Sequence, residues 1–134
     1  MRKIFLDTNI VLDLIDAERP NNKNIHLLLK HLITNDMNIV VSEDMLSTIF
    51  YIQKDKPLVL KFLYSIQKSW IISPFGKNVI KKAIELSLEK NLDLEDMLQC
   101  LCAKENECEA LITNDEKFYH CGVPIYTIES FLKL

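Results

Sequence analysis

Glycine is scarce in this sequence, since the 134 residues include only two. A loop that cradles a nucleotide phosphate needs several closely spaced glycines, so this kind of site is excluded. The sequence also lacks an apolar run long enough to cross a bilayer, and no apolar leader segment stands at its start. We therefore expect a cytoplasmic protein that makes no contact with a membrane.

A surplus of basic residues is also absent. Lysine and arginine together number 16 against 19 aspartates and glutamates, which gives a formal net charge of −3. The lysines are scattered along the chain, and solvated helix faces explain them most simply. Because a basic patch is the usual electrostatic footprint of a nucleic-acid-binding protein, binding of nucleic acid must depend on local patches, metal ions or a partner.

The four cysteines show no spacing typical of a metal site or a disulfide framework. Cys100 and Cys102 fall within a helical pattern, where two positions turn the chain by about 200°, so their side chains cannot chelate one metal. Cys121, which follows His120, has no matching partner spacing. We expect the cysteines, including Cys108, to be reduced thiols and mostly buried.

Hydrophobic residues make up 49% of the chain and form short apolar runs that alternate with amphipathic segments. The runs predict four buried strands and a fifth candidate strand at an edge, at residues 4–6, 39–41, 70–72, 110–113 and 124–126. The amphipathic segments predict helices near residues 10–15, 23–34, 42–52, 57–66, 77–90, 94–107 and 127–133. This alternation is typical of an α/β fold with a central parallel sheet of four to five strands, covered on both faces, in a single domain, 1–134.

Three aspartates stand at comparable places in this pattern. Asp7 ends the first predicted strand, Asp115 follows the fourth, and Asp96 lies in the first turn of the helix before the fourth. Ligands of open α/β sheets bind just outside the carboxyl ends of the strands, so the three side chains are expected to converge there. Carboxylates this close repel one another unless a cation joins them, and Mg²⁺ prefers oxygen ligands. A bound Mg²⁺ activates water for phosphodiester hydrolysis.

Each aspartate also has a simpler interpretation when it is taken alone. Asp7 is compatible with a turn before the helix, although Asn9 is the better helix cap by residue type. Asp96 suits the helix dipole, with Asp93 as the capping residue, and Asp115 is compatible with an ordinary loop. Only their joint placement at strand ends favours a metal site.

Two blocks of sequence resemble the PIN-domain nucleases, in particular the VapC-like toxins of bacterial toxin–antitoxin pairs. The blocks are Phe5-Leu-Asp-Thr-Asn-Ile-Val-Leu-Asp-Leu-Ile and Leu94-Glu-Asp-Met-Leu-Gln, the latter continued by Ala110-Leu-Ile-Thr-Asn-Asp-Glu-Lys-Phe. The resemblance implies a three-layer α/β/α fold and a ribonuclease that depends on Mg²⁺ or Mn²⁺. It implies that Asp7, Asp96 and Asp115 bind the metal, with Asn9 and Thr113 as hydrogen-bonding supports.

The sequence departs from the family at one acidic position. Family members carry a glutamate in the helix after the second strand, and that register falls on Thr48 here. Glu43 and Asp44 are acidic but lie a turn or more earlier, and one helical turn spans about 5.4 Å. Either Glu43 reaches the site from the strand end, or the site has three acids. As a residue at the N-terminus of a helix, Glu43 is also explained by the dipole.

These observations define three hypotheses. The first is a metal-dependent endoribonuclease, the toxin of a type II toxin–antitoxin system. The second is a catalytically weakened or inactive PIN-fold interaction module, which Thr48 and the acidic net charge favour. The third is a phosphoacceptor domain of receiver type. That class needs an adjacent acidic pair after the first strand and a lysine after the last one, and the pair is missing here.

The resemblance further implies an RNA substrate, a homodimer and a small antitoxin protein whose tail lies in the acidic groove. Apolar residues on two helices are candidates for these contacts, although core packing explains most of them equally well: Met45, Ile49, Tyr51, Ile52, Leu58, Phe62 and Tyr64. Arg19, in the loop after the first helix, is a candidate phosphate contact, and a surface salt bridge is its simpler interpretation.

Overall fold

The computed structural model describes residues 1–134 and contains one sheet of five parallel strands. The strands are β1 (Lys3–Leu6), β2 (Asn38–Ser42), β3 (Ile71–Ser73), β4 (Ala110–Ile112) and β5 (Ile125–Tyr126), in the order β3-β2-β1-β4-β5. β1 is central, and its Ile4 pairs with Ile39 on one side and Ala110 on the other. The predicted α/β class and parallel sheet of four to five strands are confirmed.

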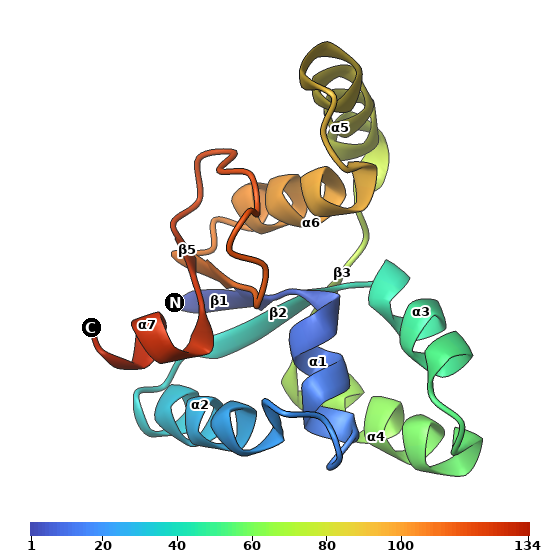
Figure 1. Ribbon diagram of the computed structural model, residues 1–134, viewed down its shortest axis with the longest axis vertical. Helices are drawn as coiled ribbons and strands as arrows, with labels where there is room; N and C mark the ends of the chain where they lie inside the picture. Colours follow the sequence, from blue (N-terminus) through green and yellow to red (C-terminus); the bar gives the residue numbers. More distant parts are fainter.

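Seven helices cover the sheet in two layers (Figure 1). They are α1 (Thr8–Ile15), α2 (Asn22–Thr34), α3 (Asp44–Ile52), α4 (Lys56–Ser69), α5 (Gly76–Lys90), α6 (Leu94–Glu105) and α7 (Ile128–Leu132). In Figure 1, α5 and α6 lie above the sheet and the other helices lie below it. No helix combines the length and the apolar character that crossing a membrane requires.

The strands are apolar on both faces because both faces are covered. Ile4 and Leu6 of β1 point into the larger core with the side chains of α1, α2, α3, α4 and α7. Phe5, between them in sequence, points to the opposite face and packs with residues of α6 and of the segment 113–124. α5 packs on α6 through a separate small cluster that includes Ala83 and Met97. This explains why the strands contain runs of consecutive apolar residues.

Helix ends follow the local sequence in most cases. Asp93 caps α6 by accepting a hydrogen bond from the Asp96 amide at 3.0 Å, and Thr127 caps α7. The first helix differs from expectation, because Asp7 is its N-cap and Asn9 is not. Ser42 ends β2 and does not cap α3; its hydroxyl instead accepts a hydrogen bond from Gln99 Nε2 at 2.9 Å.

The expectation that all four cysteines are reduced is wrong for two of them. Cys100 of α6 and Cys121 form a disulfide, with 6.1 Å between their Cα atoms. The segment after β4 folds back over α6 before it enters β5, and this tertiary return leaves no local spacing signal in the sequence. Cys102 and Cys108 are free and buried, as predicted, and burial raises the pKa of the Cys108 thiol to about 12.

Reducing this disulfide is expected to lower the free energy of unfolding. The bond joins residues 21 positions apart. Closing a loop of this size lowers the conformational entropy of the unfolded chain and so stabilises the folded state by about 3 kcal/mol. Urea unfolding of the protein with and without dithiothreitol measures the change, and Cys121→Ser should reproduce it without reductant. Cys108→Ser, at a free thiol, is the control for adding reductant: it must leave the dithiothreitol effect intact. Equal midpoints for the oxidised and reduced protein would contradict this expectation.

Candidate active site at the carboxyl edge of the sheet

Asp7 is fixed at the junction of β1 and α1. It directly follows β1 and is 6% exposed. Its Oδ2 accepts a hydrogen bond from the Thr113 hydroxyl at 2.9 Å, and its Oδ1 accepts one from the Thr8 amide at 2.8 Å. Thr113 follows β4, the strand beside β1, so parallel pairing brings both residues to the same edge. The carboxylate of Asp7 therefore has one orientation.

Asp115 lies at this edge because it follows Thr113 by two residues. Its amide donates to the Thr113 hydroxyl at 3.2 Å, and its own Oδ1 accepts from the Lys117 amide at 2.9 Å. The residue is exposed. Its charge raises the pKa of Asp7, which shows that the two carboxylates share one electrostatic field.

Asp96 reaches the same edge from the first turn of α6. Partial burial raises its pKa to about 6, and the charges of Asp93, Asp7 and Asp115 add to the shift. Burial is also the main cause of the raised pKa of Asp7, which the two hydrogen bonds partly offset. Carboxylates resist ionisation when they are buried beside like charges. The three aspartates singled out from the sequence thus lie in one neighbourhood.

Besides Asp93, the acids Glu95 and Asp44 lie in the same electrostatic neighbourhood. Burial raises the pKa of Glu95, and the charges of Asp7, Asp44 and Asp93 raise it further. From α3, therefore, Asp44 is the acid that acts on the group through Glu95. Glu95 was not singled out from the sequence, because its neighbour Asp96 matched the motif. The three acidic residues within 93–96 were the signal that could have pointed to Glu95.

The remaining predicted site residues make no hydrogen bond to Asp7, Asp96 or Asp115. Glu43 is exposed at the N-cap of α3, and its backbone amide donates to Ser73 O at 2.8 Å. Thr48 is half-buried, and its hydroxyl donates to Asp44 O within α3 at 3.3 Å. Asn9 is exposed in the first turn of α1. Of the expected supports, Thr113 is the one that holds an aspartate, Asp7.

The donor chemistry of this edge fits a hard divalent cation. Asp7, Asp96 and Asp115 supply carboxylates, which are the ligands that Mg²⁺ and Mn²⁺ prefer. No three of the acidic, histidine or cysteine side chains approach closely enough to form a complete ligand group. Asp7 is fixed, whereas the Asp96 carboxylate accepts no hydrogen bond and the Asp115 carboxylate accepts only one, from a backbone amide. These two side chains have oxygen atoms available for a cation.

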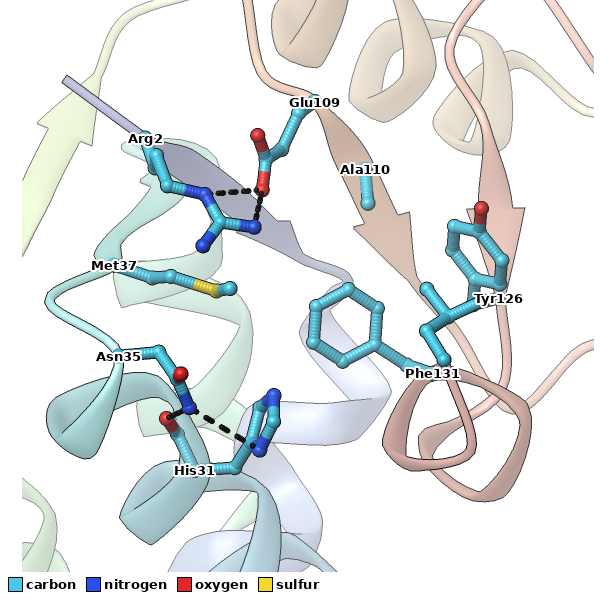
Figure 2. Close-up of a pocket in the computed structure, with 9 residues that line it drawn as sticks. Arg2, His31, Asn35, Met37, Glu109, Ala110, Tyr126 and Phe131 are labelled. Carbon is cyan, nitrogen blue, oxygen red and sulfur yellow. Dashed lines mark hydrogen bonds and ion pairs between the residues drawn. The ribbon is translucent and has the colours of Figure 1, made fainter.

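A cavity at the opposite edge of the sheet has a different character (Figure 2). It encloses about 470 Å³ and lies where the strands begin, beside Arg2, Met37 and Glu109. Its one carboxylate, Glu109, is paired with Arg2 at 2.8 Å. Figure 2 shows His31 and Phe131 facing the same space from α2 and α7. Because this cavity has no cluster of free carboxylates, it is no competitor for metal-dependent chemistry.

The chain belongs to the PIN domain family, whose model matches residues 4–123. It is 35% identical over 133 residues to Ribonuclease VapC1 from Aquifex aeolicus (strain VF5), a match that covers 96% of this chain and 92% of that protein. The resemblance expected from the two sequence blocks is confirmed.

Solved structures share the fold at lower identity. A VapBC2 complex from Rickettsia felis, bound to a DNA fragment from its promoter, superposes with a TM-score of 0.72 at 18% identity and covers 93% of this chain and 98% of that one. A toxin–antitoxin complex from Klebsiella pneumoniae gives 0.69 at 21% identity, with 93% and 97% covered. The Mycobacterium tuberculosis toxin VapC20, which cleaves the sarcin–ricin loop, gives 0.68 at 13%, with 86% and 92% covered.

The raised pKa of Asp96 makes stability depend on pH in the metal-free protein. The folded state holds this proton up to about pH 6, whereas an ordinary aspartate releases it near 3.8, so stability falls as the pH rises through this window. Asp96→Asn should therefore stabilise the protein at pH 7 by about 1 kcal/mol, less than the full shift implies because the residue is partly screened.

Urea unfolding in EDTA at pH 7 and pH 4 measures this difference. The gain should disappear at pH 4, where the wild-type carboxyl is protonated in the folded state. Glu89→Gln, at an exposed position on α5, is the control for removing one negative charge from the surface. A gain from Asp96→Asn that is equal at both pH values would contradict the electrostatic explanation.

Proposed function

We propose that this protein is a metal-dependent endoribonuclease and the toxin of a type II toxin–antitoxin system, located in the cytoplasm. The observation that carries the proposal is the gathering of Asp7, Asp96 and Asp115 at the carboxyl edge of the sheet. The charge of Asp115 raises the pKa of Asp7, and the charges of Asp7 and Asp115 raise the pKa of Asp96. The similarity to a ribonuclease over nearly the whole chain supports the same reaction class.

Asp7, Asp96 and Asp115 would hold Mg²⁺ or Mn²⁺ at this edge. When bound, the ion polarises a phosphoryl oxygen and lowers the pKa of a bound water. Asp7 contributes a carboxylate that needs no reorganisation, because Thr113 and Thr8 already fix both of its oxygens. Without a cation, the negative field of the edge opposes the approach of an RNA phosphate, so the acids serve hydrolysis only together with the metal.

The alternative function, a weakened or inactive PIN-fold interaction module, has its own support. Thr48 replaces the family glutamate, and Glu43 stays exposed at the helix N-terminus. The acidic side chains also do not form a complete ligand group as they stand. Glu95 interacts electrostatically with Asp7, and Asp44 interacts with Glu95, so these two acids are candidates to compensate for Thr48. The two functions differ in one respect, which is turnover of RNA.

An antitoxin and a second copy of the chain are the proposed protein partners. Two of the structural relatives were solved as toxin–antitoxin complexes, which supports a partner of this kind. Among the residues expected to make these contacts, Met45 and Ile49 are buried in the core and are excluded. Tyr51 is 87% exposed and Tyr64 67% exposed, so the surface of α3 and α4 retains apolar area for a partner.

RNA cleavage by the purified protein tests the proposed function. With Mg²⁺ or Mn²⁺ the wild type should cleave RNA, and EDTA should abolish the reaction. Asp7→Asn and Asp96→Asn should each reduce the rate by about 100-fold or more, since losing one charge-stabilising group typically costs about 10²–10³ in kcat.

Glu89→Gln supplies the matched control, because it removes an exposed charge on α5. It should leave cleavage unchanged. Equal cleavage by the wild type and both aspartate variants would remove the three-acid site. No cleavage by any of them, with Mn²⁺ still bound, would establish the interaction module instead.

A further inference from the structure

Asp13 of α1 is a buried carboxylate that lies outside the three-acid group. It is 2% exposed, and each of its oxygens accepts a short hydrogen bond. Oδ1 accepts from Arg19 Nε at 2.6 Å, and Oδ2 accepts from Asn114 Nδ2 at 2.6 Å. Its backbone carbonyl also accepts from Asn22 Nδ2 at 2.8 Å. Asp13 thus joins α1 to the loop before α2 and to the segment after β4.

Packing alone does not explain a charge at this position. A buried carboxylate is expensive unless it is paired and hydrogen-bonded, and apolar residues of similar volume often serve packing equally well. Arg19 forms an ion pair with Asp13 and is itself partly exposed. Of the two interpretations of Arg19, the structure therefore supports the salt bridge and not the phosphate contact. The second oxygen of Asp13 is directed to Asn114, which carries no charge to neutralise.

The position of Asn114 gives this bond its significance. It stands between Thr113, which holds Asp7, and Asp115, whose charge acts on Asp7. The segment 113–115 has no regular secondary structure. On the side of the site, the Asp115 amide donates to the Thr113 hydroxyl, which donates to Asp7. On the other side, Asn114 donates to Asp13.

We propose that Asp13 is a positioning residue for the acidic site, which sets the place of Asp115 and Thr113 through its hydrogen bond to Asn114. The inference rests on the proposed function. Asp13 touches neither Asp7, Asp96 nor Asp115, so it acts on them only through Asn114. Groups that orient metal ligands from behind change metal affinity by about 10–100-fold when they are removed.

Calorimetric titration with Mn²⁺ alone tests the proposal without any assay of cleavage. Asp13→Ala removes both side-chain oxygens, and with them the bond from Asn114, so it should weaken Mn²⁺ binding by about 10-fold or more. Asn114→Ala removes the same bond from a half-buried loop position and should have a similar effect. The double variant should bind Mn²⁺ no more weakly than the single variant with the lower affinity, because both substitutions break the same hydrogen bond.

Asp16→Asn is the matched control, since it neutralises a neighbouring aspartate whose side chain bonds only to the Glu18 amide. It should bind Mn²⁺ like the wild type. Circular dichroism establishes which variants are folded, and Asn114→Ala carries the test if Asp13→Ala does not fold. Wild-type affinity in folded Asp13→Ala or Asn114→Ala would overturn this inference alone. Failure of the wild type to bind Mn²⁺ would overturn the proposed function and this inference with it.

Discussion

The parallel pairing of β1 with β4 is the constraint on which the site depends. It places Thr113 beside Asp7, although 106 positions separate them in the sequence, and the hydroxyl–carboxylate bond between them closes the junction. α6 then lies over β1 and β4 through the core that contains Phe5 and Leu111. The first turn of α6 brings Asp96 to the same edge. A change in this pairing would separate all three aspartates.

Like charges at this edge oppose folding, and the rest of the structure offsets their repulsion. Burial and neighbouring carboxylates raise the pKa of Asp7 and Asp96. Hydrogen bonds from Thr113 and Thr8, and the large core beneath β1, hold Asp7 in place nonetheless. Proteins keep such local conflict where function requires it, and a divalent cation relieves it directly. The acidic edge therefore lowers the stability of the folded state and is suited to binding a metal.

Much of this arrangement was predictable because it rests on short-range patterns. Ile4–Leu6 and Ala110–Ile112 are apolar runs with polar residues immediately after them, so both strands and the aspartates at their ends are visible in the sequence. The Cys100–Cys121 disulfide and the Asp13–Asn114 bond were not predictable, because each joins segments that meet only after the chain folds back. Glu95 went unnoticed since its neighbour matched the motif.

A crystal structure of the protein soaked in Mn²⁺, with the ion located by its anomalous scattering, tests the central claim most directly. We expect one or two ions within about 2.0–2.3 Å of oxygens from Asp7, Asp96 and Asp115, with Asp7 still bonded to Thr113. We expect any additional acid to be Glu95 or Asp44. An ion bound away from Asp7, or a carboxyl edge that stays free of Mn²⁺ at saturating concentration, would contradict it.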